Sequence, residues 1–486
     1  MKKEAKKINN SEEKLGITSR ADNFSQWYLD IIKSADLAEY GPSKGSMVIK
    51  PHGYAIWELI KNELDKRIKK TGVSNAYFPL LIPEKLLRKE QEHIEGFSPE
   101  IVAATYAGGK RLKEALIVRP TSETIIYKII SGWIRSYKDL PILINQWANV
   151  VRWEMRPRLF LRTTEFLWQE GHTAHATDLE AKNRALKMLK VYRDFAKEIL
   201  AIPTIAGVKT ASERFAGAKE TYTLEAMMQD GKALQLATSH DLGQNFSKPF
   251  GIKFIDEEGK LNYCYQTSWG MSTRVIGALI MVHSDDVGLI LPPQIAPVQV
   301  VVVPIWPKEK DRKIVVKKAV NVYKRVRRIF RVELDASEQH AGQKFYEWER
   351  KGVPIRIEIG PKEVEQNKAL IVRRDTRTKR LVEIEILEEE IKRELIRMQN
   401  DLYEKALQFR NKRTVEVNNW VQFKKEIKKN NFVIAYFKED KEIEQKIKIE
   451  TGATARCIIL EQKGRIGKCM YSGKPTKTRV LFARAY

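Results

Sequence analysis

The stretch from Asn145 to His172 concentrates side chains that can bind anions, cations and flat rings. Polar and apolar residues alternate around Arg152 and Glu154 and again, after a short loop, through Arg162, Phe166, Trp168, Glu170 and His172. A period of two predicts two strands of an antiparallel hairpin with one polar face. An ordinary solvated face is the plain alternative, but Phe166 and Trp168 would gain nothing from exposure. Together these side chains could hold phosphates, an ammonium group and a heterocycle.

Two motifs give this stretch a family resemblance. Arg-x-Glu, a loop and Arg-x-x-x-Phe resemble motif 2 of the class II aminoacyl-tRNA synthetases. RPTSET (119–124) and FLWQEGH (166–172) are similar to the prolyl-tRNA synthetases of archaeal and eukaryotic type, and the resemblance extends from about Arg20 to Tyr486. It implies a homodimer that activates L-proline with ATP to prolyl-adenylate, releasing pyrophosphate. The prolyl group would then be transferred to the 3′ end of tRNA(Pro).

The resemblance implies that Arg152 and Arg274 are the catalytic residues. Arg152 would bridge the proline carboxylate and the α-phosphate, because a planar guanidinium can bind two anions at once. Phe166 and Arg274 would sandwich the adenine, Glu154 would accept its amino group and Arg162 would hold the γ-phosphate. The other implied ATP contacts are Thr163, Gln235, Thr238 and Ser272. Mg²⁺ would accompany ATP, because it prefers hard oxygen ligands.

A second set of residues is implied to bind proline. Its members are Thr121, Glu123, Arg152, Trp168, Glu170, His172, His240 and Ser268. Glu123 would pair with the proline ammonium group, since a buried cation needs a partner. In the alternative interpretation, Glu123 only complements the dipole of the helix that begins at RPTSET. Thr121 or Ser122 can cap this helix. Gln235 differs in strand parity from Thr238 and His240, so it needs a bulge or a backbone contact to face the same pocket.

Hydrophobic spacing predicts the elements around this site. Residues 53–72 have apolar residues at helical spacing, and AYFPLLIP (76–83) predicts an apolar strand. This pair resembles motif 1, the dimer interface of the class, although an ordinary buried helix and strand would have the same pattern. Residues 178–200 predict an amphipathic helix. Arg274 begins an apolar helix, where a cation is disfavoured unless an anion lies beside it.

Proline spacing and composition divide the chain. Pro292, Pro293 and Pro297 mark a linker, after which buried strand runs alternate with a basic helical stretch at 308–328. We expect a charged tail (1–18) and an α+β catalytic domain of class II synthetase type, with an antiparallel sheet flanked by helices (19–293). An anticodon-binding α/β domain (298–400) and a small α/β C-terminal domain (401–486) are expected to follow, on the resemblance.

The C-terminal domain of this subtype often holds zinc through four cysteines, but this chain departs from that pattern. Lys438 and Ile443 stand where the first cysteine pair belongs, and Ser472 replaces the partner of Cys469. One soft ligand cannot form a tetrahedral site. We therefore expect no protein-bound metal, no structural zinc, and a C-terminal domain that packs by apolar contacts alone.

Composition restricts the class of protein. The 486 residues are 43% apolar and 31% charged, as in globular chains, and no apolar run is long enough to cross a membrane. Three cysteines and an N-terminus without an apolar signal region indicate the cytoplasm. The net charge of +25 suits a polyanion such as tRNA, although a lysine-rich composition bias could also produce it.

Three other hypotheses compete with this interpretation. A threonyl or seryl synthetase is the nearest, but a threonyl pocket needs a zinc-binding cysteine, and none lies near the hairpin. A synthetase-like RNA-binding protein without catalysis would usually lack the motif arginines, whereas Arg152, Arg162 and Arg274 are present. A generic basic RNA-binding protein would not explain the carboxylates on the hairpin face. Between His172 and Ser268 the sequence contains only segments of the catalytic core. We therefore expect no inserted editing domain, and no editing in cis, that is, no hydrolysis of misacylated tRNA by this chain.

Overall fold

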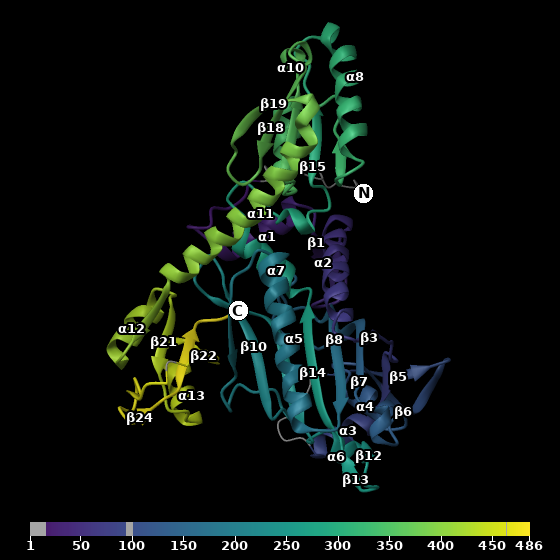
Figure 1. The fold of residues 1–486 in the computed structure, drawn as a ribbon, viewed down its shortest axis with the longest axis vertical. Helices are drawn as coiled ribbons and strands as arrows, with labels where there is room; N and C mark the ends of the chain where they lie inside the picture. The colour runs from purple at the N-terminus through teal and green to yellow at the C-terminus, as the bar shows by residue number, and fades with distance from the viewer. Residues whose placement is uncertain (1–15, 94–100, 463) are drawn as a thin grey trace, which may run out of the picture.

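The computed structural model describes residues 16–93, 101–462 and 464–486, so most of the predicted 1–18 tail lies outside the described residues. Figure 1 shows three parts. A large sheet with its helices fills the lower half, a five-stranded domain lies at the top, and a small α/β part lies at the lower left. The long helix α11 (Leu387–Lys412) connects the last two parts. Within these residues no helix is long and apolar enough to span a bilayer.

An eleven-stranded sheet forms the centre of the molecule, in the order β20-β21-β25-β22-β9-β10-β11-β14-β8-β7-β3. Only its two end pairs, β20–β21 and β3–β7, are parallel. The strands from the predicted catalytic region are β3 (Ser74–Asn75), β7 (Ile142–Val151), β8 (Glu165–His175), β9 (Thr204–Val208), β10 (Glu220–Met227), β11 (Ala233–Gly243) and β14 (Tyr265–Ser272). The prediction of an antiparallel sheet is confirmed.

Helices cover one face of this sheet and build the main core. They are α1 (Phe24–Ser34), α2 (Pro51–Lys69), α5 (Asp178–Glu198) and α7 (Arg274–His283). The predicted amphipathic helix is α5, and a capping box starts it: Thr177 accepts from the N–H of Glu180, whose carboxylate accepts from the N–H of Thr177. Because neighbouring residues of β14 point to opposite faces, Trp269 packs into this core while Ser268 lies on the other face.

The predicted hairpin is present as β7 and β8. Ile144 lies opposite His172, and Ala148 lies opposite Trp168. The loop between the strands is longer than predicted, because regular pairing ends at Val151 and resumes at Glu165. Arg152 to Thr164 form the connection, which is closed by the N–H of Arg152 on the carbonyl of Thr164 at 2.8 Å.

The prediction of one strand over AYFPLLIP is wrong. Only β4 (Leu81–Pro83) is regular, and it belongs to a separate three-stranded sheet with β5 (Val102–Ala107) and β6 (Lys110–Val118). In the middle of this segment, the backbone groups of Phe78 bond to side chains instead of to a neighbouring strand. The N–H of Phe78 donates to Gln146, and its carbonyl accepts from Arg119. Pro79 has no N–H, so it could not continue a ladder in any case.

The five-stranded domain has the order β16-β15-β17-β18-β19. The strands are β15 (Val300–Pro304), β16 (Val332–Leu334), β17 (Ile355–Ile359), β18 (Lys368–Arg373) and β19 (Lys379–Glu383), with helices α8 (Glu309–Val326), α9 (Ala341–Arg350) and α10 (Pro361–Glu365). Strand β15 is buried along its length between two parallel partners, which explains its unbroken run of valines. Helix α11 starts here and continues past residue 400, so the predicted division at 400/401 falls inside a helix.

The C-terminal part continues the central sheet. Its strands are β20 (Thr414–Val417), β21 (Phe432–Tyr436), β22 (Thr454–Ile459) and β25 (Arg479–Ala483), with helices α12 (Trp420–Lys428) and α13 (Lys441–Thr451). Strand β22 pairs with β9 through Ile458 and Ile459. The expectation of packing by apolar contacts alone is wrong, because Arg479 forms an ion pair with Glu416 and Arg456 forms one with Glu225 of β10.

Short elements complete the fold. They are β1 (Ala38–Tyr40), β2 (Met47–Ile49), α3 (Glu84–His93), α4 (Glu123–Ile130), α6 (Ser247–Phe250), β12 (Lys253–Ile255), β13 (Leu261–Tyr263), β23 (Gly467–Lys468), β24 (Pro475–Thr476) and the 3₁₀ turns 137–139, 293–295 and 384–386. The predicted proline linker is packed rather than loose, since Pro293 and Ile295 are buried.

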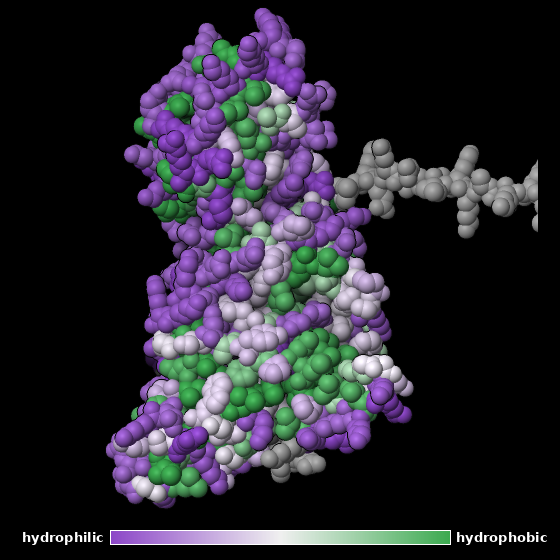
Figure 2. All heavy atoms as spheres, turned by 90° about the vertical axis from the view of Figure 1, so that its right-hand side faces the viewer, coloured by the Kyte–Doolittle hydropathy of each residue, from purple (hydrophilic) through white to green (hydrophobic). Residues whose placement is uncertain are grey.

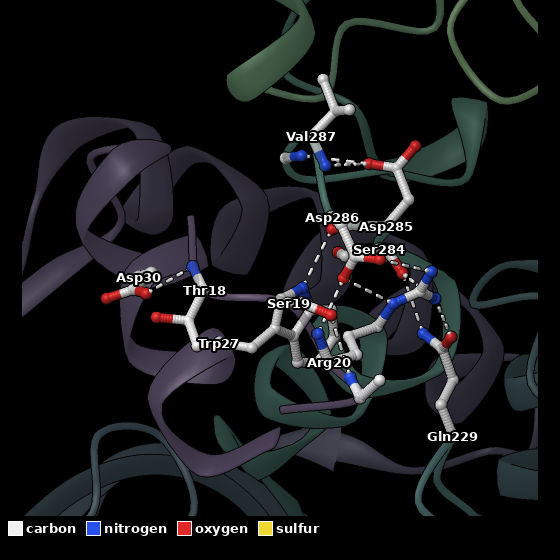
Figure 3. Close-up of polar contacts among 12 residues, drawn as sticks. Thr18, Ser19, Arg20, Trp27, Asp30, Gln229, Ser284, Asp285, Asp286 and Val287 are labelled. Carbon is white, nitrogen blue, oxygen red and sulfur yellow. Dashed lines mark hydrogen bonds and ion pairs between the residues drawn. The ribbon is translucent and has the colours of Figure 1, made fainter. Parts of the chain in front are cut away.

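The turn that follows α7 joins three parts of the chain. Arg20 of the N-terminal segment binds Asp286 and donates to the carbonyl of Ser284, as Figure 3 shows. Arg374 of the five-stranded domain binds Asp285 through two nitrogens at 2.9 and 2.7 Å. Trp27 of α1 donates to the carbonyl of Asp285. These bonds therefore fix the C-terminal end of helix α7, which begins at Arg274, to the N-terminal segment with α1 and to the five-stranded domain.

Candidate active site

A cavity of about 320 Å³ opens on the face of the sheet opposite α5. Strands β8, β10, β11 and β14, the start of α4 and the start of α7 surround it. Most of the residues predicted as a site line this cavity: Thr121, Glu123, Arg152, Phe166, Trp168, Glu170, His172, Gln235, Thr238, His240, Ser268, Ser272 and Arg274. Strand parity explains why alternate residues of β8 and β14 meet here.

Glu170 and His172 form a buried polar group at one end of the cavity. Glu170 accepts hydrogen bonds from Ser122 and, at 2.5 Å, from the amide of Gln146. His172 lies between Glu170 and the hydroxyl of Tyr127, with 3.2 Å to each. Both side chains are at most 2% exposed, so their orientation is set by these partners and not by solvent.

Glu123 lies at the start of α4 and also reaches the cavity. It is 4% exposed and accepts a hydrogen bond from Thr121. The predicted capping role of Ser122 is wrong: Ser122 occupies the N-cap position, but its hydroxyl donates to Glu170. With Glu170, Glu123 gives one end of the cavity two carboxylates, a place where a cation would be bound.

Arg152 extends along the aromatic wall. Its guanidinium carbon lies 5.5 Å from the ring centres of both Phe166 and Trp168, and its Nε donates to the carbonyl of Pro120 at 2.8 Å. These contacts fix the plane of the guanidinium while its terminal nitrogens stay open to the cavity. Arg152 therefore lies between the acidic end and the remaining space.

Arg274 is the second cation of the cavity and the first residue of α7. Burial, and after it the charges of Arg152 and Arg162, lower the pKa of Arg274 to about 10. It is still charged at neutral pH, at the positive end of a helix dipole and beside other arginines. Its Nε donates to the carbonyl of Leu161 at 3.2 Å. Such a cluster of positive charge favours an anionic ligand.

Gln235 reaches the cavity through a β-bulge, as its parity required. Opposite β10, pairing moves from Ala237 on Leu224 to Gln235 on Glu225, so Leu236 is the extra residue. Thr238 and His240 face the cavity without such help. The hydroxyl of Thr221 lies 3.0 Å from Nδ1 of His240, whose ring also contacts Phe215 at 4.7 Å between centres. Burial lowers the pKa of His240 to about 3, so this imidazole is neutral.

Three predicted residues lie outside the cavity wall. Glu154 and Arg162 belong to the hairpin loop, where they approach each other at 3.8 Å. The side chain of Arg162 is half exposed. Thr163 is buried and donates its hydroxyl to the carbonyl of Glu165, so it supports the turn into β8.

Other cavity residues escaped the sequence interpretation. Lys209 and Phe215 line the cavity from the segment between β9 and β10, and Thr221 lines it from β10. Phe215 belongs to SERFAGA, a segment that resembles a substrate-covering loop of the family, so that likeness was an available signal. No signal in the sequence identified Lys209 or Thr221, because their positions depend on the pairing between β9, β10 and β11.

Two buried donors at the cavity lack a partner among the described residues. They are the indole N–H of Trp168 and the hydroxyl of Ser268. Buried polar groups are nearly always hydrogen-bonded. Both residues line the cavity, so a ligand with acceptor groups would satisfy them.

The described part of the chain contains no group of three or more His, Cys, Asp or Glu that could hold a metal ion. An ion that arrives with ATP needs fewer protein ligands, because phosphate oxygens and waters supply most of its six. Glu213 and Gln235 give oxygen donors at the cavity besides Glu123 and Glu170, which neighbouring groups already engage. This donor set fits Mg²⁺ bound to a nucleotide.

Three family models match successive parts of the chain. The model of the tRNA synthetase class II core domain (G, H, P, S and T) matches residues 105–283. The anticodon binding domain model matches 299–394, and the model of the prolyl-tRNA synthetase C-terminal domain matches 420–486.

Close relatives extend over nearly the whole chain. The chain is 54% identical to the proline–tRNA ligase of Chloroherpeton thalassium and 51% identical to that of Phocaeicola vulgatus, in each case over 97% of this chain and 99% of the relative. It is also similar to the crystal structure of prolyl-tRNA synthetase from Cryptosporidium parvum complexed with halofuginone and AMPPNP. That structure is 40% identical, covers 97% of this chain and all of its own, and has a TM-score of 0.92.

Proposed function

The chain belongs to the prolyl-tRNA synthetase family and so joins proline to tRNA at the expense of ATP, and we propose that the cavity described above is where prolyl-adenylate forms. The family accounts for the reaction. We assign the residues that perform it from the geometry and charge of the cavity, which is acidic at one end and cationic at the other.

The acidic end would bind proline. Glu123 and Glu170 attract its ammonium group, and Thr121 and His172 hold these carboxylates in place. Trp168, His240 and Ser268 would enclose the ring and the carboxylate. Proline has no side-chain group for hydrogen bonding, so fit to a rigid wall must carry selectivity, and one methylene is worth only about 1–3 kcal/mol.

The cationic end would bind ATP. Arg152 lies between the two ends, where it can bind the proline carboxylate and the α-phosphate together. Phe166 and Arg274 would hold the adenine between them, with Gln235, Thr238 and Ser272 along its edge. Glu154, Arg162 and Thr163 lie beside this end in the hairpin loop, where we expect Arg162 to reach the terminal phosphate. Mg²⁺ bound to ATP would neutralise phosphate charge when present.

One observation carries this assignment: two carboxylates and two arginines converge on one cavity, with Arg152 between them. Exchange of pyrophosphate into ATP, measured with each of the twenty amino acids and without tRNA, tests it. Exchange with proline alone is expected. Exchange with threonine or serine would favour the neighbouring synthetase types. Folded protein that shows no exchange, with or without tRNA, would favour an RNA-binding protein without catalysis.

We expect a homodimer through the face that carries α2 and the three-stranded sheet. Figure 2 shows apolar side chains gathered on this side of the molecule. Leu81, Ile101 and Ile129 are exposed there. Patches of this kind often mark interfaces. Sedimentation of the purified chain should give twice the chain mass, and Leu81→Asp should shift it toward the monomer. A monomer at micromolar concentration would remove this proposal.

The macromolecular partner would be tRNA(Pro), bound in part by the basic five-stranded domain, and the site of action would be the cytoplasm. No editing in cis is expected, since α5, β9, β10, β11, α6, β12 and β13 account for the segment between His172 and Ser268. Hydrolysis of alanyl-tRNA by the pure protein would contradict this. Structural zinc is not expected either, and stoichiometric zinc in atomic emission of purified protein would be the contrary result.

A further inference from the structure

A buried ionic cluster connects the C-terminal part with the wall of the cavity. Glu225 of β10 is fully buried. Its Oε1 accepts from Lys209 at 2.9 Å. Its Oε2 accepts from Nε of Arg456 at 3.0 Å and forms an ion pair with Nη2 of the same guanidinium at 2.9 Å. Arg456 belongs to β22, more than two hundred residues away in sequence. A carboxylate at this depth needs such partners, because burial without them is strongly unfavourable.

The charge of Glu225 is maintained by this arrangement. Burial alone would raise the pKa of Glu225, but the charges of Lys209 and Arg456 outweigh burial, and the pKa is lowered. Glu225 therefore acts only as a hydrogen-bond acceptor at neutral pH. Arg456 also donates to the hydroxyl of Thr454 at 3.0 Å, which limits the rotation of its guanidinium.

A chain of hydrogen bonds leads from Glu225 into the cavity. The hydroxyl of Thr223 donates to Oε1 of Glu225 at 2.9 Å and accepts from Nε2 of Gln235 at 3.0 Å. Since a carboxylate cannot donate, the Thr223 hydroxyl must, and only its acceptor side is left for Gln235. Gln235 therefore directs its NH₂ group toward Thr223, and its amide oxygen is left for the cavity that it lines.

We propose that Arg456, supplied by the C-terminal part, is a positioning residue for ATP binding. By occupying Oε2 of Glu225, it leaves Oε1 to be shared by Lys209 and Thr223, and Thr223 then orients the Gln235 amide with its oxygen toward the nucleotide. The inference rests on the proposed contact of Gln235 with ATP. It makes the C-terminal part a component of the ATP site, beyond its role in extending the sheet.

The close approach of β22 to β9 supports this role. Gly207 of β9 has no side chain at the crossing: an added Cβ would lie 2.4 Å from Sγ of Cys457 and 2.5 Å from the carbonyl oxygen of Ile458. Only glycine allows this approach. Because Cys457 follows Arg456 directly, the same contact sets how far Arg456 extends toward Glu225.

Steady-state pyrophosphate exchange by variants of the full chain tests the proposal. Arg456→Met removes the charge and keeps the length of the side chain. It should raise KM for ATP about ten-fold, a typical size for a residue that orients a binding group from behind, and leave KM for proline within roughly two-fold. Arg456→Lys should recover part of the loss, because an ammonium group can still donate to Oε2.

Arg479→Met is the matched control. Arg479 is a similarly buried arginine on the adjacent strand β25, and its partner Glu416 faces away from the cavity with its side chain 56% exposed. This variant should keep the wild-type KM for ATP. Equal values of KM for ATP in Arg456→Met and Arg479→Met would overturn the proposal.

Thr223→Val keeps the proposal testable if Arg456→Met does not fold. It removes only the hydroxyl that links Glu225 to Gln235 and should raise KM for ATP selectively, whereas an unchanged KM would overturn the proposal. Gln235→Ala separates this inference from the site assignment. If Gln235→Ala raises KM for ATP and neither Thr223→Val nor Arg456→Met does, only the positioning role is wrong. If Gln235→Ala has no effect, the assigned ATP contact is wrong and the positioning role with it.

Discussion

The order of charged residues along the cavity decides how the two substrates would be arranged. The charge of Arg152 interacts with Glu123 and Glu170 on one side and with Arg274 on the other, so Arg152 lies between an acidic and a cationic part of the cavity. A zwitterionic amino acid and a nucleotide fit this order in one orientation only, with the ammonium group toward the acids and both anions toward Arg152. Little proton transfer is needed to form an adenylate, so positioning and charge stabilisation should dominate the rate.

Arg152→Ala should nearly abolish adenylate formation while the fold persists. The side chain supplies the cation that two anions would share, so its loss should lower pyrophosphate exchange on the order of a thousand-fold or more, about 4 kcal/mol of transition-state stabilisation. Arg156→Ala, an exposed arginine of the same loop, is the control and should exchange normally. Near-normal exchange by Arg152→Ala would remove Arg152 from the mechanism.

Glu123→Gln should weaken proline binding selectively. The substitution keeps the shape of the side chain and removes the charge that would pair with the ammonium group. A hydrogen bond to a charged group contributes about 1.5–3 kcal/mol, so KM for proline should rise by about ten- to a hundred-fold. KM for ATP should change little. A parallel rise in both constants would show that Glu123 supports the cavity as a whole instead.

At the level of elements, periodicity predicted what depends on neighbouring residues along one strand. The alternation through Phe166, Trp168 and Glu170 identified β8 and its cavity face. The parity of Gln235 predicted either a bulge or a backbone contact, and the structure has a bulge at Leu236. The single strand predicted over AYFPLLIP is wrong, because the side chains of Gln146 and Arg119 bind the backbone groups of Phe78 there. Those partners lie far away in sequence and leave no local pattern.

Gly171→Ala should disturb strand β8 and the proline end of the cavity together. Gly171 lies between Glu170 and His172, and an added Cβ would lie 2.0–2.2 Å from atoms of the Trp269 ring. Overpacking of this kind costs about 1–3 kcal/mol. The thermal midpoint should fall, and KM for proline should rise because both neighbours shift. Gly342→Ala in α9, where nothing lies within 4 Å of the added Cβ, should leave KM for proline unchanged and should not lower the thermal midpoint, because alanine favours the helix more than glycine does. A wild-type thermal midpoint and KM for proline in Gly171→Ala would show that the Trp269 ring moves aside at no measurable cost, which would contradict this prediction.

At the scale of the whole molecule, the pairing of β22 with β9 changes the interpretation of the domains. The composition and the proline-marked boundary predict where the chain divides, and the five-stranded domain follows that pattern. Nothing local in the sequence predicts that strands 414–483 complete the catalytic sheet, because β9 and β22 are separated by about half of the chain. Gly207 is where this closure is most tightly constrained, but a lone glycine in a strand is equally typical of a bulge or a tight bend.

Two buried histidines, His175 and His283, and the half-buried His240 should make the stability of the catalytic part fall as the pH is lowered. Burial lowers the pKa of His175 to about 4, of His240 to about 3 and of His283 to about 4. The unfolded chain binds protons at these positions below about pH 6.5, whereas the folded chain does not, so protons favour unfolding. At pH 5.5 each histidine should cost roughly 1.4 kcal/mol relative to pH 7.5.

The thermal midpoint should therefore fall steadily from pH 7.5 to 5.5, before the carboxylates titrate. His283 bonds to the carbonyl of Leu200 and lies outside the cavity, so it gives a clean test. His283→Gln can still donate to that carbonyl but cannot bind a proton. Its midpoint should fall less steeply with decreasing pH than that of the wild type, and the exposed His340→Gln should follow the wild type. A midpoint that is constant across this range would mean that these imidazoles are protonated in the folded chain, and the neutral state assigned to His240 beside the proline pocket would then be wrong as well.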